Sequence, residues 1–454
     1  MAVPPGSRLG VVTGSAAQHR VVIVGGGFAG LYAAKGLAGD EAVDVSLVDR
    51  RNFHLFQPLL YQVATGALSP GEIAQPLRAI LRKAGNVTVL LGEARGIDPS
   101  RRELLMSDGG PIPYDSLVVA TGARHAYFGH DEWASLAPGL KTIEDAIEIR
   151  RRILIAFEAA EREADEERRR EWMTFVVVGG GPTGVELAGS LGEIANDTLR
   201  HDFRSIHAPD ARILLIEALD RILPSYPASL SRSAVRQLEK LGATVRTETR
   251  VTHIDEACVR VQAASGEETI PTRTVLWAAG VQASSFGRQL AGTLGVETDR
   301  AGRIEVTPEL TVPGHPEVLV LGDLAVAKQK NGKPVPGVAP AAIQQGRYAA
   351  QALRRRARGQ TGSPFRYKDK GDVATIGRLS GVADIRWLGP FGQFSGFLAW
   401  AMWLGIHIFY LIGFANRVTV TIRWAWSFLT RGRSTRLITE GELLPPIRKP
   451  EPPA

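Results

Sequence analysis

The chain has 454 residues, of which 44% are hydrophobic and 22% are charged, and this composition is typical of a globular protein with about two to four domains. The formal net charge of +7 indicates an anionic partner, either nucleic acid or an anionic membrane surface, or else ordinary solubilising charge. The single cysteine, Cys258, excludes an intramolecular disulfide and a Cys-x-x-Cys site, and with nine scattered histidines we expect no metal site. Residues 1–20 lack the continuous apolar core of a secretory signal, so we expect the catalytic domains to stay in the cytoplasm.

The first predicted element is a buried parallel strand, Val21–Val24, followed by a glycine-rich turn and a helical pattern through Leu37. The turn has the spacing G-x-G-x-x-G, with its glycines at Gly25, Gly27 and Gly30. Such a turn lets the backbone approach a pyrophosphate, which then faces the free N–H groups of the helix N-terminus. A second strand ends in Asp49, the place for an acid that binds a ribose hydroxyl. The unit therefore predicts a dinucleotide site.

The same unit returns after the strand Phe175–Val178. Its glycines are Gly179, Gly181 and Gly184, and its second strand ends in Glu217. A free carboxylate at Glu217 favours a 2′-hydroxyl over a 2′-phosphate, which indicates NADH, although Arg221 nearby leaves NADPH open.

Three short segments complete the two units: SLVVATG up to Gly122, TVLWAAG up to Gly280, and EVLVLGDLA around Asp323. With them the chain resembles the two-dinucleotide-domain flavoprotein reductases, which implies FAD in the first unit. The predicted fold is α/β, with two Rossmann-like domains, the NADH domain inserted in the FAD domain, and a C-terminal membrane-associating helical region. The segment Glu158–Trp172 carries charge on nearly all faces, and we expect a solvated helix there, with a partner-binding segment as the alternative.

The electrons need an acceptor outside the chain. Many relatives of this fold pass them to a cysteine pair, which one cysteine cannot form. The acceptor is then a quinone, a ferredoxin-type protein or oxygen.

Four segments resemble the type II NADH dehydrogenases, single-subunit NADH:quinone oxidoreductases that do not pump protons. They are Arg51–Arg78, GGGPTGVELAG from Gly179, Ala339–Ala350 and Tyr367–Arg378. The resemblance implies non-covalent FAD, NADH as donor, and a membrane quinone, ubiquinone or menaquinone, as acceptor. No nucleic acid is expected, and a homodimer is left open.

The resemblance also implies roles for single residues. Glu186 matches an acid near the nicotinamide–flavin junction, and Lys370 matches a basic residue that contacts this acid or the flavin region. The family's quinone motif A-Q-x-A-x-Q retains its second glutamine as Gln344, whereas Pro340 replaces the first. The alternatives are that Glu186 satisfies helix N-terminal donors and that Gln344 satisfies local backbone. Residues expected to bind FAD are Gly25, Gly27, Phe28, Ala29, Gly30, Asp49, Arg50, Ala94, Thr121, Gly122, Gly322, Asp323 and Ala339. Residues expected to bind NADH are Gly180, Gly181, Thr183, Gly184, Glu217, Ala279 and Gly280.

Pro340 is suited to the first turn of a helix, where its missing N–H costs nothing. A helix that begins there would point its positive end at the flavin pyrimidine and stabilise negative charge on it.

The C-terminal part is apolar and aromatic. A charge-free interval between Arg386 and Arg417 is long enough to span about 30 Å of hydrocarbon as one helix. We expect it instead to lie in the membrane plane, with one face that suits the lipid–water interface formed by Trp400, Trp403, His407 and Tyr410. The opposite face carries Leu398, Met402, Ile408, Phe409 and Ile412. A spanning helix and a buried dimer interface are the alternatives.

The next segment is amphipathic, with Val418, Ile422, Ala425 and Leu429 on one side. Arg423 on the other side would meet lipid headgroups, and four more arginines would add attraction to anionic lipid: Arg417, Arg431, Arg433 and Arg436.

The predicted domains are 19–150 (first FAD part), 172–280 (NADH), 281–365 (second FAD part), 366–436 (C-terminal region, with anchoring helices at about 392–431) and 437–454 (disordered tail). The sequence thus predicts an NADH:quinone oxidoreductase at the cytoplasmic face of the membrane. The alternatives are a soluble NADH-dependent reductase of a small iron–sulfur protein, with the C-terminus as dimerisation element, and a membrane-bound redox sensor or scaffold.

Overall fold

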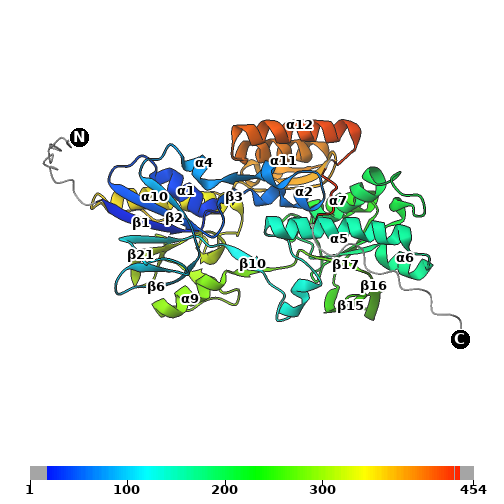
Figure 1. The fold of residues 1–454 in the computed structure, drawn as a ribbon, viewed down its shortest axis with the longest axis horizontal. Coiled ribbons are helices and arrows are strands. Elements are labelled where there is room, and N and C mark those ends of the chain that lie inside the picture. The colour runs from blue at the N-terminus through cyan, green and yellow to red at the C-terminus, as the bar shows by residue number, and fades with distance from the viewer. Residues whose placement is uncertain (1–17, 434, 440–454) are drawn as a thin grey trace, which may run out of the picture. The chain divides into compact units, whose positions relative to one another are not determined.

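The computed structural model describes residues 18–433 and 435–439, and the chain forms two compact units within them (Figure 1). The first unit takes the described residues up to Asn52, then Leu77–Gly122 and Ser284–Tyr367. The second takes Phe53–Pro76, Ala123–Ala283 and the described residues from Lys368 onward. The cofactor-domain boundaries at 150, 172, 280 and 365 stay predictions.

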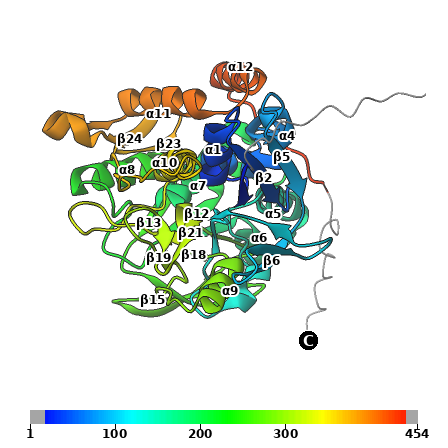
Figure 2. The same cartoon turned by 90° about the vertical axis from the view of Figure 1, so that its left-hand side faces the viewer.

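The first unit is built on a six-stranded sheet of order β20-β21-β9-β1-β2-β5, parallel except for β20. Buried β-branched residues in β1, such as Val21 beside Val45, explain why this strand lies inside the sheet. Helix α1 packs against α10 (Figure 2), and a side chain at Gly346 would overlap the carbonyl oxygen of Ala29. The strands of this sheet are β1 (His19–Val24), β2 (Val43–Asp49), β5 (Val87–Leu91), β9 (Ser116–Val119), β20 (Thr311–Val312) and β21 (His315–Val320). The unit's other strands are β6 (Ala94–Asp98), β7 (Glu103–Met106), β8 (Ile112–Pro113), β19 (Ile304–Glu305) and β22 (Ala325–Val326). Its helices are α1 (Phe28–Leu37), α4 (Leu77–Leu81), α9 (Ser285–Leu294), η5 (Gly322–Leu324) and α10 (Ala339–Arg356).

The second unit repeats this plan with a four-stranded parallel sheet of order β13-β12-β11-β17. A three-stranded antiparallel sheet, β14-β15-β16, lies in the same unit, as β6-β7-β8 does in the first. The strands of these two sheets are β11 (Thr174–Val178), β12 (Arg212–Ile216), β13 (Ala243–Arg246), β14 (Arg250–Ile254), β15 (Cys258–Ala263), β16 (Gly266–Pro271) and β17 (Thr274–Trp277). Two further pairs of strands belong to the unit: β3 (Phe53–Leu55) with β4 (Ala74–Pro76), and β10 (Ala123–His125) with β18 (Val281–Ala283). The helices of this part are η1 (Gln57–Leu59), α2 (Leu60–Ala64), α3 (Pro70–Ile73), η2 (Asp131–Ser135), α5 (Ile143–Arg162), α6 (Glu166–Trp172), α7 (Pro182–Glu193), η3 (Ile194–Thr198), η4 (Ala208–Asp210) and α8 (Ala228–Lys240). The predicted α/β class with two doubly wound nucleotide sheets is confirmed.

The charged segment Glu158–Trp172 is not one solvated helix. Helix α5 ends at Arg162 with a buried apolar face, and α6 begins at Glu166 after Asp165, whose side chain caps it and accepts from Arg168 N–H. The capping aspartate explains the restart, since it satisfies a free N–H group at the start of the second helix.

The C-terminal part of the second unit is a three-stranded sheet covered by helix α11, with α12 beside that helix (Figures 1 and 2). The backbone of Ile376 in β23 lies so close to α7 that a side chain at Gly189 would overlap its carbonyl oxygen. None of the helices in the described ranges is long and apolar enough to span a membrane. The elements are β23 (Asp372–Gly377), β24 (Ser380–Asp384), η6 (Arg386–Gly392), β25 (Gln393–Ser395), α11 (Phe397–Tyr410) and α12 (Phe414–Thr430). The predicted tail, 437–454, lies outside the described residues except for 437–439.

The predicted interfacial stripe on α11 is wrong. Trp403 and His407 are only 2% and 8% exposed, because α11 turns them toward the rest of the second unit, where their rings stack 4.2 Å apart. Trp400 and Tyr410 are half-buried. The opposite face is the exposed one, with Phe409 at 69%. Both faces of α11 are apolar, so helical spacing could not decide which of them packs on protein.

Of the arginines expected at lipid headgroups, Arg433 is buried, which contradicts the expectation for this residue. The other four also have partners in the second unit, and their contact with lipid stays a prediction. Arg423 pairs with the buried carboxylate of Glu72 at 3.0 Å. Arg433 is buried and pairs with Glu193 at 2.7 Å. The other three bind acids or carbonyl groups of the second unit: Arg417 to Phe409 and Leu411, Arg431 to Asp197, and Arg436 to Asp202. A carboxylate inside the protein competes with lipid for each charge. The predicted apolar side of α12 is exposed, by contrast, with Leu429 at 77%.

Candidate functional site

The glycine turn of the first unit needs glycine at two places. Gly25 has φ +104°, a left-handed conformation that side chains disfavour, and a Cβ there would overlap the backbone of Ala120. A Cβ at Gly30 would overlap the carbonyl oxygen of Gly25, so α1 starts directly on the turn. Gly27 is the N-cap of α1, and a Cβ there would meet no atom of the described residues within 4 Å. The turn is therefore a cradle into which a diphosphate fits.

Asp49 supports this turn with its side chain. One carboxylate oxygen accepts the N–H of Gly26 at 2.5 Å, and the other accepts the N–H of Arg51 at 2.7 Å. Arg50 beside it is exposed, and Phe28 at the start of α1 is half-buried. A ribose contact by Asp49 stays a prediction.

The remaining predicted residues of the first unit lie at strand ends. Thr121 binds Ser284 through their hydroxyl groups at 2.6 Å, and Gly122 has φ +67°. Gly322 and Asp323 form η5 after β21, Ala339 begins α10, and Ala94, half-buried, begins β6.

The two neighbouring glutamines of helix α10, Gln344 and Gln345, make different contacts. Pro340 lies in the first turn, as predicted, and the half-buried Gln344 donates to the carbonyl oxygen of Pro340 at 3.2 Å. The buried Gln345 accepts the N–H of Gly322 at 2.5 Å and so fixes the helix to the loop that carries Asp323. No pattern in the sequence indicated this role of Gln345.

The glycine turn of the second unit has the same geometry. Gly179 has φ +107°, and a Cβ at Gly184 would overlap the carbonyl oxygen of Gly179. Glu217 supports this turn in the same way as Asp49 supports the first. Its carboxylate accepts the N–H groups of Gly180 at 2.6 Å and Leu219 at 2.8 Å. Gly181 caps α7 beside open space, Thr183 is half-buried in its first turn, and Ala279 and Gly280 follow β17.

Glu186 lies on α7, two residues after the last glycine of the turn, and is half-buried. Burial raises its pKa well above the usual range, and the Thr375 backbone and the Trp403 indole offset this only in part. Such a displaced pKa marks a candidate acid.

Two further titratable groups of the second unit have displaced pKa values. Burial raises the pKa of the Tyr61 hydroxyl well above its usual range, and the negative charge of Glu186 raises it further. Burial lowers the pKa of His407 to about 4, so its ring is neutral and its Nδ1–H donates to the carbonyl oxygen of Trp403 at 2.7 Å. His407 was not predicted as a site residue.

The ammonium group of Lys370 donates to the hydroxyl of Tyr410 at 2.9 Å. The expected contact of Lys370 with Glu186 or the flavin region stays a prediction.

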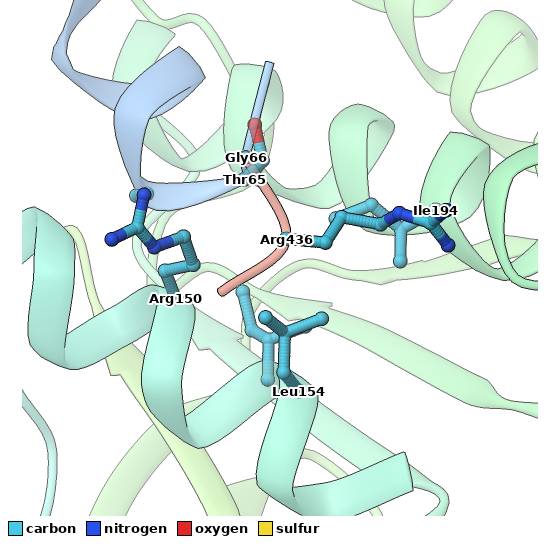
Figure 3. A pocket seen from close by; sticks show the side chains of 8 residues that line it. Thr65, Gly66, Arg150, Leu154, Ile194 and Arg436 are labelled. Carbon is cyan, nitrogen blue, oxygen red and sulfur yellow. The ribbon is translucent and has the colours of Figure 1, made fainter. Parts of the chain in front are cut away.

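A separate small pocket of the second unit contains none of the predicted site residues (Figure 3). The buried Arg150 lines it, and burial lowers the pKa of that guanidinium group. Among the described residues no group of three or more His, Cys, Asp or Glu side chains could hold a metal ion. The thiol of Cys258 donates to Asp255 at 3.3 Å.

The chain matches the family described as pyridine nucleotide-disulphide oxidoreductase over residues 19–346. It is 46% identical over 430 residues to the type II NADH:quinone oxidoreductase Ndh of Mycobacterium tuberculosis, covering 93% of this chain and 91% of that protein. The chain belongs to the type II NADH:quinone oxidoreductases.

Solved structures agree on the fold of this type II NADH:quinone oxidoreductase. NDH2 from Plasmodium falciparum, solved in complex with NADH, superposes with a TM-score of 0.82 at 20% identity and covers 90% of this chain and 98% of its own. A ferredoxin reductase from Rhodopseudomonas palustris reaches only 0.62 at 20% identity, with 81% and 82% covered. The 46% identity to type II NADH:quinone oxidoreductases does not favour the alternative of an iron–sulfur protein reductase.

The cofactors of this type II NADH:quinone oxidoreductase are FAD and NADH, and its two turns fit them. Each has a glycine whose added side chain would meet only open space, at Gly27 and Gly181, and each has an acid that orders the turn. The assignment of FAD to the first turn and NADH to the second stays a prediction.

Proposed function

We propose that Glu186 is the proton store for quinone reduction in this NADH:quinone oxidoreductase. Reduction of a quinone to a quinol takes two electrons and two protons. A hydride from NADH brings two electrons and one proton, so the second proton must come from another source. FAD, when bound, accepts the hydride and passes the electrons on. A carboxyl group whose pKa is raised holds its proton to a higher pH than an ordinary glutamate, and such a group is suited to supply that second proton.

The other residues of the proposal would bind the two nucleotides and orient the quinone. The turn at Gly25–Gly30, with Asp49 and Asp323, would hold FAD, and the turn at Gly179–Gly184, with Glu217, would hold NADH. A carboxylate at Glu217 supports NADH over NADPH. Gln344, with its amide at the first turn of α10, would donate to a quinone carbonyl group.

Lys370 has a less direct part. Because its ammonium group is bound to Tyr410 at the end of α11, we place it as a cation that stabilises nearby negative charge and not as a proton donor.

We further propose that the exposed apolar faces of α11 and α12 lie on lipid, with the quinone entering from there. The support is the concentration of large exposed apolar side chains on these two helices: Phe397, Leu398, Phe409, Val418, Ile422, Trp426 and Leu429. Since the five arginines pair within the protein, attachment depends on apolar contact more than on charge. The cytoplasmic face and a homodimer remain predictions.

The acid role is tested with Glu186→Gln and two electron acceptors. Ferricyanide takes electrons without protons, whereas a short-chain quinone needs both. We expect the NADH–ferricyanide rate to stay within about twofold and the NADH–quinone rate to fall by roughly 100-fold, the usual size of a general-acid effect. Equal rates with both acceptors relative to the parent would remove Glu186 from the reaction.

The lipid contact is tested by flotation with liposomes of neutral and anionic lipid. Phe409→Ser with Leu429→Ser should abolish flotation, while salt at about 1 M, which screens surface charge, should reduce it little for the parent enzyme. Release by salt alone would show that charge holds the protein.

A further inference from the structure

Three large apolar side chains are exposed in the part of the second unit from Ala123 to Ala283, all of which the structure describes. Leu219, 52% exposed, comes after β12, and Glu217 accepts its N–H. Val281, 50% exposed, comes after β17, and the ring of Phe128, 71% exposed, reaches the same strand end. A parallel sheet binds its ligand at these carboxyl ends, so apolar groups exposed there indicate places for the apolar parts of a ligand.

The ring of Phe128 lies on the backbone that follows β17. A Cβ added to Gly280 would overlap Cζ of this ring, so the ring and the glycine are in direct contact. The same backbone borders the nucleotide turn two residues earlier, since a Cβ added to Gly179 would lie 2.7 Å from the carbonyl carbon of Ala278. Phe128 therefore lies beside the segment on which the turn packs.

The order of the strands indicates which half of a bound nucleotide is nearer to Phe128. In the sheet β13-β12-β11-β17, strand β11 leads into the glycine turn and has β12 on one side and β17 on the other. Glu217 at the end of β12 marks the side of the adenosine ribose. A dinucleotide whose diphosphate lies on the turn would then extend its nicotinamide half to the other side, toward β17 and Phe128.

The backbone of Phe128 is held in a conformation that a bulky side chain disfavours. Its φ is +53°, in the left-handed region. Both neighbours are fixed, since the Tyr127 hydroxyl donates to the carbonyl oxygen of Ala137 at 2.8 Å and the Trp277 indole donates to that of Ala126 at 3.0 Å. Packing on Trp277, with 6.3 Å between the ring centres, leaves most of the Phe128 side chain exposed. Contacts inside the unit thus do not account for a strained aromatic residue at this place.

We propose that Phe128 binds the nicotinamide half of NADH, and that its ring forms the apolar surface against which the nicotinamide ring lies. This inference rests on the proposed binding of NADH to the turn at Gly179–Gly184. The turn and its acid offer polar groups, which suit a diphosphate and a ribose. The nicotinamide ring has two flat faces, and contact with an aromatic ring stabilises such a face.

ADP-ribose tests the role of Phe128, because it contains the adenosine, diphosphate and second ribose of NADH but not the nicotinamide ring. In the full-length FAD-loaded enzyme, Phe128→Ala should raise the KM for NADH roughly tenfold in the NADH–ferricyanide assay. The inhibition constant of ADP-ribose should stay within about twofold of the parent value. Phe128→Tyr, which retains the ring, should match the parent in both. Equal rises for NADH and ADP-ribose in Phe128→Ala, or no change in either, would overturn the proposal.

The matched control is Leu379→Ala. Leu379 is also a large exposed side chain with a left-handed φ, +59°, but it lies in the turn between β23 and β24. This variant should have parental constants for NADH and ADP-ribose.

Phe128→Gly separates binding from folding. Glycine adopts a positive φ without strain, so this variant should have a Tm at or above that of the parent, although its KM for NADH rises as in Phe128→Ala. A Tm several degrees below that of the parent would assign Phe128 to the support of the fold instead.

Failure of the proposed function has a different signature. Glu217→Ala should weaken both NADH and ADP-ribose, since it acts on the half that the two molecules share. If Glu217→Ala changes neither constant, NADH does not bind this turn and the proposed function falls. If it weakens both while Phe128→Ala weakens neither, only the role of Phe128 falls.

Discussion

The two units use one kind of turn for two nucleotides and differ in the helix that begins on it. In both, an acid at the end of the second strand holds the turn: Asp49 binds Gly26, and Glu217 binds Gly180. The position two residues after the last glycine is Tyr32 in the first unit and Glu186 in the second. Tyr32 lies under the guanidinium group of Arg347, 5.1 Å from its ring centre, whereas Glu186 is a carboxyl group whose pKa is raised by desolvation. Both side chains are half-buried. In the proposed function the shared parts bind the nucleotides, and the proposed acid lies in a position that the repeat does not share.

The largest expected effects come from substitutions in the two glycine turns, and they differ between the turns. Gly30→Val forces a side chain onto the backbone of Gly25 and should abolish FAD retention, as measured by flavin absorbance after purification. Gly184→Val should retain FAD but slow flavin reduction by NADH at least roughly 100-fold in stopped flow, since a displaced helix misplaces the donor. Gly292→Ala and Gly71→Ala, whose added methyl groups meet no described atom within 4 Å, are the controls. Flavin loss in Gly184→Val instead would reverse the assignment of the two turns.

The acids that hold the turns should give a smaller effect. Glu217→Ala removes a charged acceptor of two backbone N–H groups and should raise the KM for NADH roughly 10- to 100-fold, with little change for NADPH. Asp49→Ala should raise the dissociation constant of FAD by a similar factor without altering the preference between NADH and NADPH. An altered preference in Asp49→Ala would mean that NADH binds the first unit.

Helix α7 is held by a buried ion pair, whereas α1 is held by close backbone packing on α10. Arg433→Ala leaves Glu193 without its buried partner and should reduce the free energy of unfolding by about 3 kcal/mol in urea titrations. Arg431→Ala, whose pair with Asp197 is exposed, should cost less than about 1 kcal/mol. Equal losses would show that burial does not matter for this ion pair.

The smallest effect concerns thermal stability at Glu186. Its folded-state pKa is raised, so the stability linked to its proton is complete below the unfolded-state pKa and is lost as pH rises through the folded-state value. Glu186→Gln carries no such proton. The Tm of Glu186→Gln minus the Tm of the parent should therefore increase by a few degrees as pH rises from about 5 to about 9. Tyr32→Phe, at the matching position of the first unit, should show a constant difference.

The repeated turns could be predicted from the sequence because glycine spacing, β-branched strands and strand-end acids are local signals. Gly25, Gly179, Asp49 and Glu217 all lie where such signals place them. The first turn of α10 at Pro340 was predictable for the same reason.

The surroundings of the acid were not predictable, because they depend on contacts between segments far apart in the chain. Trp403 lies more than 200 residues from Glu186. Helical spacing on α11 showed that Trp403 and His407 share a face but not that this face packs on protein. The burial of Arg433 was likewise not predictable, since nothing near it in the sequence points to Glu193.

The contact of Gly189 with the backbone of Ile376 limits inherited variation at this position. Gly189 lies one helical turn after Glu186, and Ile376 follows Thr375, whose N–H faces the acid. An added methyl group at 189 would push α7 away from β23 and draw the carboxyl group off its donor. In a library of random substitutions selected for respiration, position 189 should therefore tolerate glycine alone, although it touches neither cofactor turn nor lipid-facing helix.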